Sequence, residues 1–240
     1  MMSISIGRYF NDYTKSKKIL KEFSIDIYEN EWCKKSLKKS DLSQEFISVS
    51  SENDYKLIYE TARKKEDYNF LFLKDESIVQ FGYDIDKNGE IIDLRYAFYD
   101  KPFNHLNYIQ FLKENDIYIE DDDMTFFEEY QQYLSEAELK SSVTPIRYDY
   151  SKRQYNGLVH SISHLHIGHL NNIRIPLSYV MTPVNFISFI LRHVYWSEWK
   201  TYIQIDNNKQ NYLNNFKPVV KIDDKYFSSE ERNDSHISLI

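Results

Sequence analysis

The sequence predicts an α+β fold in which an antiparallel sheet, built from two meander segments, is flanked by helices. Apolar residues recur at helical spacing through much of the first 66 residues. Residues 69–98 and 145–175 instead hold short runs with polar and apolar residues in alternation, which is typical of antiparallel strands. We expect both β segments to join in one sheet within a single domain, residues 1–240.

The composition supports a folded protein and limits its function. Of 240 residues, 42% are hydrophobic and 16% aromatic, enough for a sizeable core. The formal net charge of −7 argues against broad affinity for a phosphate backbone but leaves room for a small basic pocket. The only cysteine, Cys33, cannot form an internal disulfide or a cysteine-based zinc site, which fits a reducing cytosol.

No segment of the sequence reads as a membrane anchor. The stretch Met1–Tyr13 lacks the apolar core of a signal peptide. The longest apolar run, Val184–Tyr195, is too short to span a bilayer. We therefore expect a cytoplasmic protein without membrane contact.

The N-terminal third, residues 1–66, is expected to be mainly helical, with helices over Tyr13–Phe23, Glu29–Leu37 and Asp54–Lys65. The last of these carries a clear apolar stripe with members three or four residues apart: Tyr55, Ile58, Tyr59 and Ala62. Three strands of the first meander follow, over Phe70–Leu73, Ile78–Ile85 and Glu90–Phe98. An Asn-Gly pair, which tolerates positive φ, predicts a tight hairpin between the last two strands.

Two helices are expected between the meanders, over His105–Asn115 and Met124–Lys140. The acidic run Glu120–Asp123 immediately precedes the second helix. A metal site is one interpretation, but acidic residues at this position more commonly cap helix amides and favour the positive end of the helix dipole. We therefore expect the run to have a structural role.

The second meander is expected to comprise strands over Ile146–Ser151, Leu158–Ile167 and Asn172–Ile175. A helix should begin near Pro183, because proline is tolerated in a first helical turn. The rest of the chain is predicted to be a loosely attached polar tail (residues 203–240), with a loop at Asn207–Asn215.

Histidines concentrate in the second meander. Five of the seven lie between His160 and His193. In an extended strand, alternate side chains share one face, which groups His160, His164 and His166. If the strands pair as a meander, one surface would carry six candidate site residues: Arg147, Asp149, His160, His164, His166 and Arg174.

Three interpretations of this group remain open from the residues. In the first, His164 and His166, with His160, act as acid and base on a phosphodiester, Asp149 orients a histidine, and Arg147 and Arg174 bind phosphate. That chemistry needs no cofactor, since RNA supplies its 2′-hydroxyl as nucleophile. In the second, His164, His166 and Asp149 bind a divalent metal. In the third, all of these residues are structural.

The same segments resemble a bacterial family of uncharacterised proteins, DUF2290. The resemblance lies in Arg147–Tyr150, Ser163–Gly168, the Arg174–Pro176 step and the Phe186–Leu191 helix. An Arg-Tyr-Asp segment followed by a histidine cluster is also similar to small toxins of the TumE type from toxin–antitoxin pairs. That similarity implies a mobile-element or phage-defence context.

We therefore expect a bacterial toxin-like or phage-defence protein that acts on RNA or another phosphodiester through its histidine-rich strand, as a ribonuclease or phosphodiesterase. The alternative is a non-enzymatic regulatory or partner subunit of a defence or toxin–antitoxin assembly. The expected partners are RNA and a protein encoded nearby. The sequence does not determine the oligomeric state.

Overall fold

A computed structural model describes residues 4–30, 41–103, 106, 108–115, 117, 125–136, 143–170, 173–214 and 220–238. The chain divides into two compact units, where the sequence predicted one continuous domain. The larger unit joins Met1–Asp100 to Thr144–Ile240, and the smaller comprises Lys101–Val143. Of the helices in the described part of the chain, none has the length and apolar character needed to cross a bilayer.

The larger unit is built on a seven-stranded sheet that confirms the α+β prediction. Its strands are antiparallel to their neighbours and follow one another in chain order, β1 to β7. Direct pairing of β4 with β5 joins the two meanders in one sheet, as expected. The strands are β1 (Ile27–Glu29), β2 (Phe70–Phe72), β3 (Ile78–Ile85), β4 (Ile91–Tyr99), β5 (Ile146–Ser151), β6 (Ser163–Ile167) and β7 (Arg174–Pro176).

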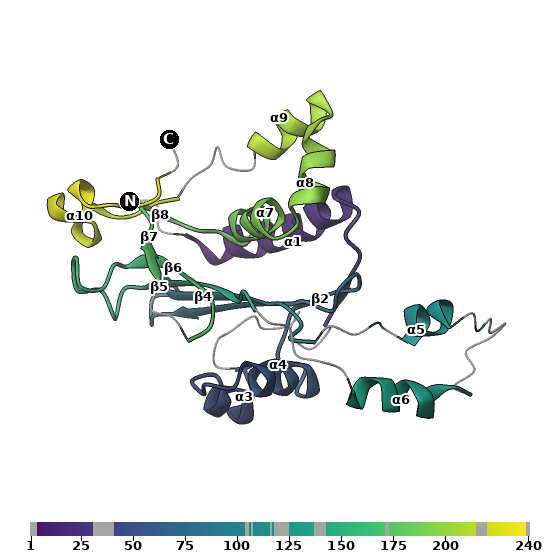
Figure 1. Ribbon diagram of the computed structural model, residues 1–240. Helices are drawn as coiled ribbons and strands as arrows, with labels where there is room; N and C mark the ends of the chain where they lie inside the picture. Colours follow the sequence, from purple (N-terminus) through teal and green to yellow (C-terminus); the bar gives the residue numbers. More distant parts are fainter. Residues whose placement is uncertain are drawn as a thin grey trace. The chain divides into compact units, whose positions relative to one another are not determined.

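Helices cover both faces of this sheet (Figure 1). The helices α1 (Ile6–Glu22) and α7 (Pro183–His193) lie side by side on one face. The helices α3 (Gln44–Val49) and α4 (Tyr55–Lys64) lie on the other face. There the rings of Phe46 on α3 and Tyr55 on α4 contact the ring of Tyr99 on β4. After α7 come α8 (Trp196–Ile203), α9 (Asp206–Asn214) and α10 (Ser229–Asn233), with a small sheet of β8 (Tyr179–Val180) and β9 (Val220–Lys221).

Strand alternation gives the sheet one apolar face and one polar face along β4, β5 and β6. The apolar face packs beneath α1 and α7 through Leu94, Tyr96, Phe98, Ile146, Tyr148, Tyr150 and Leu165. The opposite surface, the polar face, carries Asp93, Arg95, Arg147, Asp149, His164, His166 and Arg174. The burial of the aromatic face is what holds the polar side chains in place.

A buried hydrogen-bond chain links the sheet to the start of α7. The Tyr148 hydroxyl accepts from the Met181 amide at 2.9 Å and lies 3.1 Å from Ser163 Oγ, which donates to the Tyr179 carbonyl at 2.7 Å. These bonds satisfy backbone groups that would otherwise be buried without partners. They tie β5 and β6 to the segment that leads into α7.

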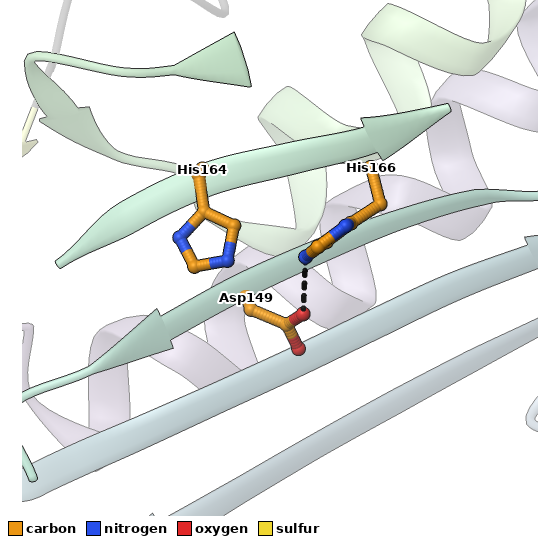
Figure 2. A group of neighbouring side chains, drawn as sticks. All are labelled: Asp149, His164 and His166. Atoms are coloured by element: carbon orange, nitrogen blue, oxygen red, sulfur yellow. Dashed lines mark ion pairs between the residues drawn. The ribbon is translucent and has the colours of Figure 1, made fainter. Parts of the chain in front are cut away.

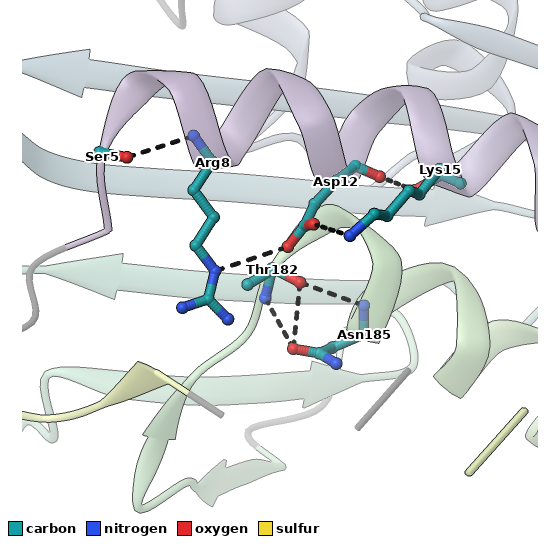
Figure 3. Close-up of polar contacts among 7 residues, drawn as sticks. Ser5, Arg8, Asp12, Lys15, Thr182 and Asn185 are labelled. Carbon is teal, nitrogen blue, oxygen red and sulfur yellow. Dashed lines mark hydrogen bonds and ion pairs between the residues drawn. The ribbon is translucent and has the colours of Figure 1, made fainter. Parts of the chain in front are cut away.

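The start of α7 lies beside α1 (Figure 3). A reciprocal cap between Thr182 and Asn185 begins the helix, with Pro183 in its first turn as the sequence predicted. On α1, the buried carboxylate of Asp12 lies 3.8 Å from Arg8 Nε and 3.6 Å from Lys15 Nζ. The paired charges let α1 carry an acidic group on its buried face, which is otherwise apolar except for Ser16.

The smaller unit is a pair of helices around an aromatic cluster. Its helices, α5 (Tyr108–Glu114) and α6 (Phe127–Ser135), are shorter than the helices that the sequence predicted here. The Tyr130 hydroxyl donates to the Leu106 carbonyl at 3.0 Å, and the Leu106 amide donates to Tyr133 Oη at 2.9 Å. The acidic run 120–123 and His105 lie outside the described residues.

The C-terminal segment differs from the loosely attached tail predicted for residues 203–240. A helix, α9, stands where the sequence predicted a loop, and Tyr212 on it is buried with its hydroxyl donating to the Ser188 carbonyl at 3.1 Å. Farther on, Val220, Ile222 and Phe227 are buried in the main core. A few widely spaced apolar side chains anchor this segment, and such spacing gives no regular period along the sequence.

One further strand prediction was wrong in extent, and one strand was not predicted at all. The strand predicted over Leu158–Ile167 begins only at Ser163, because residues 156–160 form a turn closed by an Asn156–His160 bridge. The strand β1 was missed, and it occupies Glu29, where the sequence predicted that a helix begins. Residues 31–37 of that predicted helix lie outside the described residues.

We predict that Tyr148→Phe lowers the free energy of unfolding by ~1–3 kcal/mol, because the Met181 amide would remain buried without an acceptor. Denaturant unfolding of the purified chain measures this change. Tyr150→Phe is the matched control, since Tyr150 lies on the same strand and face. Equal losses in the free energy of unfolding for the two variants would show that the hydrogen-bond chain through Tyr148 does not contribute to stability.

Candidate functional site

The pairing register places the candidate residues in two adjacent rows on the polar face. Each row crosses three neighbouring strands, with residues directly opposite one another. The first row lies on β4, β5 and β6 and the second on β5, β6 and β7. The rows are Arg95, Asp149 and His164, and Arg147, His166 and Arg174.

Asp149 lies at the centre of the group, in contact with Arg147 and His166. Arg147 Nε donates to Asp149 Oδ2 at 2.7 Å, and His166 Nε2 lies 3.3 Å from the same oxygen. Burial alone would raise the pKa of the Asp149 carboxyl, but His166, Arg147 and Arg95 outweigh it and hold the pKa below its usual range. Asp149 is therefore ionised near neutral pH and faces His166, and its predicted role in orienting a histidine stays a prediction.

His164 is the most buried member, with only 1% of its surface exposed. Its Nδ1 lies 2.9 Å from the Ser161 carbonyl, which can only accept, so we assign the hydrogen to Nδ1 and leave Nε2 as an acceptor. Burial lowers the pKa of His164 to about 4, although Asp149 acts in the opposite direction. His164 is therefore a neutral imidazole near neutral pH, with Nε2 as its available lone pair.

His160 joins the group by ring packing and not by strand alternation. It lies in the turn before β6, outside the strand that was predicted to carry it. Its ring meets that of His164 edge to face at a centroid distance of 5.0 Å, and the His164 and His166 rings lie 4.9 Å apart. The structure thus brings together all six residues that the sequence singled out, while their catalytic and binding roles stay predictions.

Arg95 is a neighbour that sequence reasoning did not assign to the site. It lies directly opposite Asp149, and its charge helps to lower the pKa of that carboxyl. Its Nε is buried and has no hydrogen-bond partner in the described part of the chain. Alternation along β4 places Arg95 on the polar face. Only the pairing of β4 with β5, which the sequence did not specify, brings Arg95 opposite Asp149.

Three of these side chains could hold a metal ion. Asp149, His164 and His166 each offer one ligand atom, and the three atoms lie within 4.8 Å of one another. Figure 2 shows both imidazoles descending from β6 toward the carboxylate on β5. Two imidazoles and one carboxylate suit zinc, manganese, iron or cobalt better than magnesium or calcium.

The surroundings of the cluster also favour an anion. On the polar face, Arg95, Arg147 and Arg174 outnumber the two carboxylates of Asp93 and Asp149. Arg147 retains 38% of its side-chain surface, and Arg174 is exposed. This local excess of positive charge in a chain of net charge −7 is suited to phosphate.

The other described histidines lie apart from the cluster. His169 Nε2 lies 2.9 Å from the Asn53 carbonyl, and its ring packs on Tyr55 of α4. His193 is exposed on α7 and packs on Phe189, and His236 packs on Phe227. These residues serve as natural controls for the site.

Comparison with known proteins adds a family and no activity. A family model described as an uncharacterized conserved protein, DUF2290, matches residues 19–239, which include every residue of the two rows. No curated protein and no solved structure matches the chain.

The burial of His164 leads to a prediction about pH in chelator-treated protein. The unfolded chain takes up a proton on His164 below about pH 6.5, whereas the folded chain resists protonation until about pH 4. Burial of His164 therefore costs stability as the pH falls through this interval, by up to ~3 kcal/mol. As the pH is lowered from 7, the free energy of unfolding should fall less steeply for His164→Gln than for the unmodified chain. Parallel pH profiles for the two proteins would contradict the assignment of a lowered pKa to His164.

Proposed function

The chain belongs to DUF2290, a family of uncharacterized conserved proteins, and we propose that it acts on RNA or another phosphodiester through the histidine-rich strand β6. One observation carries the proposal. The two rows bring three arginines, two histidines and one carboxylate together on a single sheet face of an otherwise acidic chain, and a third histidine, His160, packs on His164. This combination can bind a phosphate, move a proton and stabilise developing negative charge.

Arg147 and Arg174 are the proposed phosphate-binding residues. They lie on either side of His166, on β5 and β7 respectively. A guanidinium offers two parallel donors that match two phosphate oxygens. Phosphate bound between these arginines would therefore lie over His166, the more accessible imidazole of β6, whose side chain is 18% exposed.

RNA supplies the nucleophile in this proposal. The 2′-oxygen attacks phosphorus and the bond from phosphorus to the 5′-oxygen breaks, while His166 accepts the 2′-hydroxyl proton and a proton from solvent is added to the 5′-oxygen. Asp149 orients His166, and a cation held by Asp149, His164 and His166 would supply Lewis-acid activation of the same hydroxyl. Arg147 and Arg174 stabilise the extra negative charge that develops on the phosphorane oxygens.

The proposed setting is that of a toxin-like or phage-defence protein of the bacterial cytoplasm. It rests on the resemblance that the sequence suggests between TumE-type toxins and the Arg147–Asp149 segment with its histidine cluster, and no curated protein matches the chain. The competing proposal is a non-enzymatic subunit that binds a protein encoded nearby. That alternative predicts that the chain binds the partner tightly and does not cleave RNA, whether or not His166 is replaced.

Cleavage of a single-stranded RNA by the purified full chain tests the proposal. His166→Gln should lower the rate at least ~100-fold, because an activating imidazole is lost. Arg174→Gln should weaken RNA binding ~10–100-fold, because a charged hydrogen bond to phosphate is lost. A single 2′-deoxy substitution at the scissile position should block the reaction.

The matched controls are His193→Gln and Arg192→Gln. Both residues are exposed on α7, which lies on the opposite side of the sheet from the polar face. The two control substitutions replace histidine and arginine by glutamine, as His166→Gln and Arg174→Gln do, and should leave the rate of cleavage unaltered. Full cleavage by His166→Gln, or equal losses in the controls, would contradict the proposal.

A further inference from the structure

We infer that Asp149, His164 and His166 bind one divalent transition-metal cation of the zinc, manganese or cobalt class. The inference deepens the proposed function, and the cation's part in cleavage rests on that function. Cation binding itself can be measured without any substrate. The three ligand atoms already lie within 4.8 Å of one another.

The backbone creates this arrangement. His164 and His166 are two residues apart on β6, so both project from the same face. Asp149, on β5, is paired directly with His164 of β6. This pairing brings the Asp149 carboxylate beneath the imidazole rings of His164 and His166. Metal bonds of ~2.0–2.2 Å require the ligand atoms to approach one another a little further, and side-chain rotation alone can supply this movement.

Neighbouring groups orient the ligands as they do at metal sites. The Ser161 carbonyl holds His164 Nδ1 at 2.9 Å, which leaves Nε2 directed at the cluster. Such outer partners set the tautomer and direction of metal ligands. They also explain why a neutral histidine is buried opposite a carboxylate.

The nearby arginines set the conditions for binding. Arg147 competes with a cation for Asp149, and Arg95 and Arg174 add repulsion. A phosphate on the same face would cancel that repulsion. Cation and phosphate should therefore bind cooperatively, each raising the affinity of the other.

Titration of the chelator-treated full chain with Mn²⁺, Zn²⁺ and Co²⁺ by calorimetry, together with the visible absorption of Co²⁺, tests the inference. One equivalent should bind, and inorganic phosphate should tighten it. Asp149→Asn and His166→Gln should each weaken cation binding by at least ~100-fold. This loss is larger than the loss expected when a residue that only orients a metal ligand is replaced. His169→Gln is the control, because its ring lies apart from the cluster.

Arg147→Ala gives a test that misfolding cannot imitate. Removal of the competing guanidinium should tighten Mn²⁺ binding by about tenfold. No binding of any of the three cations, or binding that Asp149→Asn and His166→Gln leave unchanged, would overturn the inference.

The two proposals fail in different ways. Cation binding as described, with no RNA cleavage in any of the three cations, would leave the inference standing and refute the proposed function. Cleavage by the metal-free chain in chelator, with no cation bound, would do the reverse.

Discussion

The pairing register of β4, β5 and β6 is the constraint on which the rest of the structure depends. Side chains alternate along a strand, so a slip of one residue would move Tyr148 to the polar face and Asp149 into the aromatic core. Both exchanges are costly, because one exposes a fully buried ring and the other buries a charge without partners. The core and the candidate site are therefore fixed by the same choice of register.

The apolar side secures that register with specific contacts. Tyr96 packs on Tyr148 and on Phe186, with ring centroids 5.3 and 5.5 Å apart. Ser163 adds a polar requirement, because its hydroxyl lies between Tyr148 and the Tyr179 carbonyl. Side chains that never approach the polar face thus determine the distances among Asp149, His164 and His166. A rigid sheet is a suitable support for a site that needs ligands held in a set geometry.

The sequence predicted local alternation and the joining of the two meanders in one sheet, but not the register in which β4 pairs with β5. Polar and apolar residues alternate clearly in β5, which placed Arg147 and Asp149 on one face. Arg95 was missed because its neighbour Asp149 lies beyond the smaller unit in the chain, and only strand pairing brings them together. His160 was placed correctly for the wrong reason, since ring packing and not an extended strand brings it to His164. The polar composition of α9 concealed a helix that Tyr212 anchors.

A crystal structure of the full chain with Mn²⁺ and an RNA whose scissile 2′-hydroxyl is replaced by hydrogen would distinguish a cation-binding catalytic site from a purely structural cluster. We expect an anomalous peak between Asp149, His164 and His166, with a backbone phosphate in contact with Arg147 and Arg174. RNA bound elsewhere on the chain, with no metal peak between these three residues, would contradict this expectation.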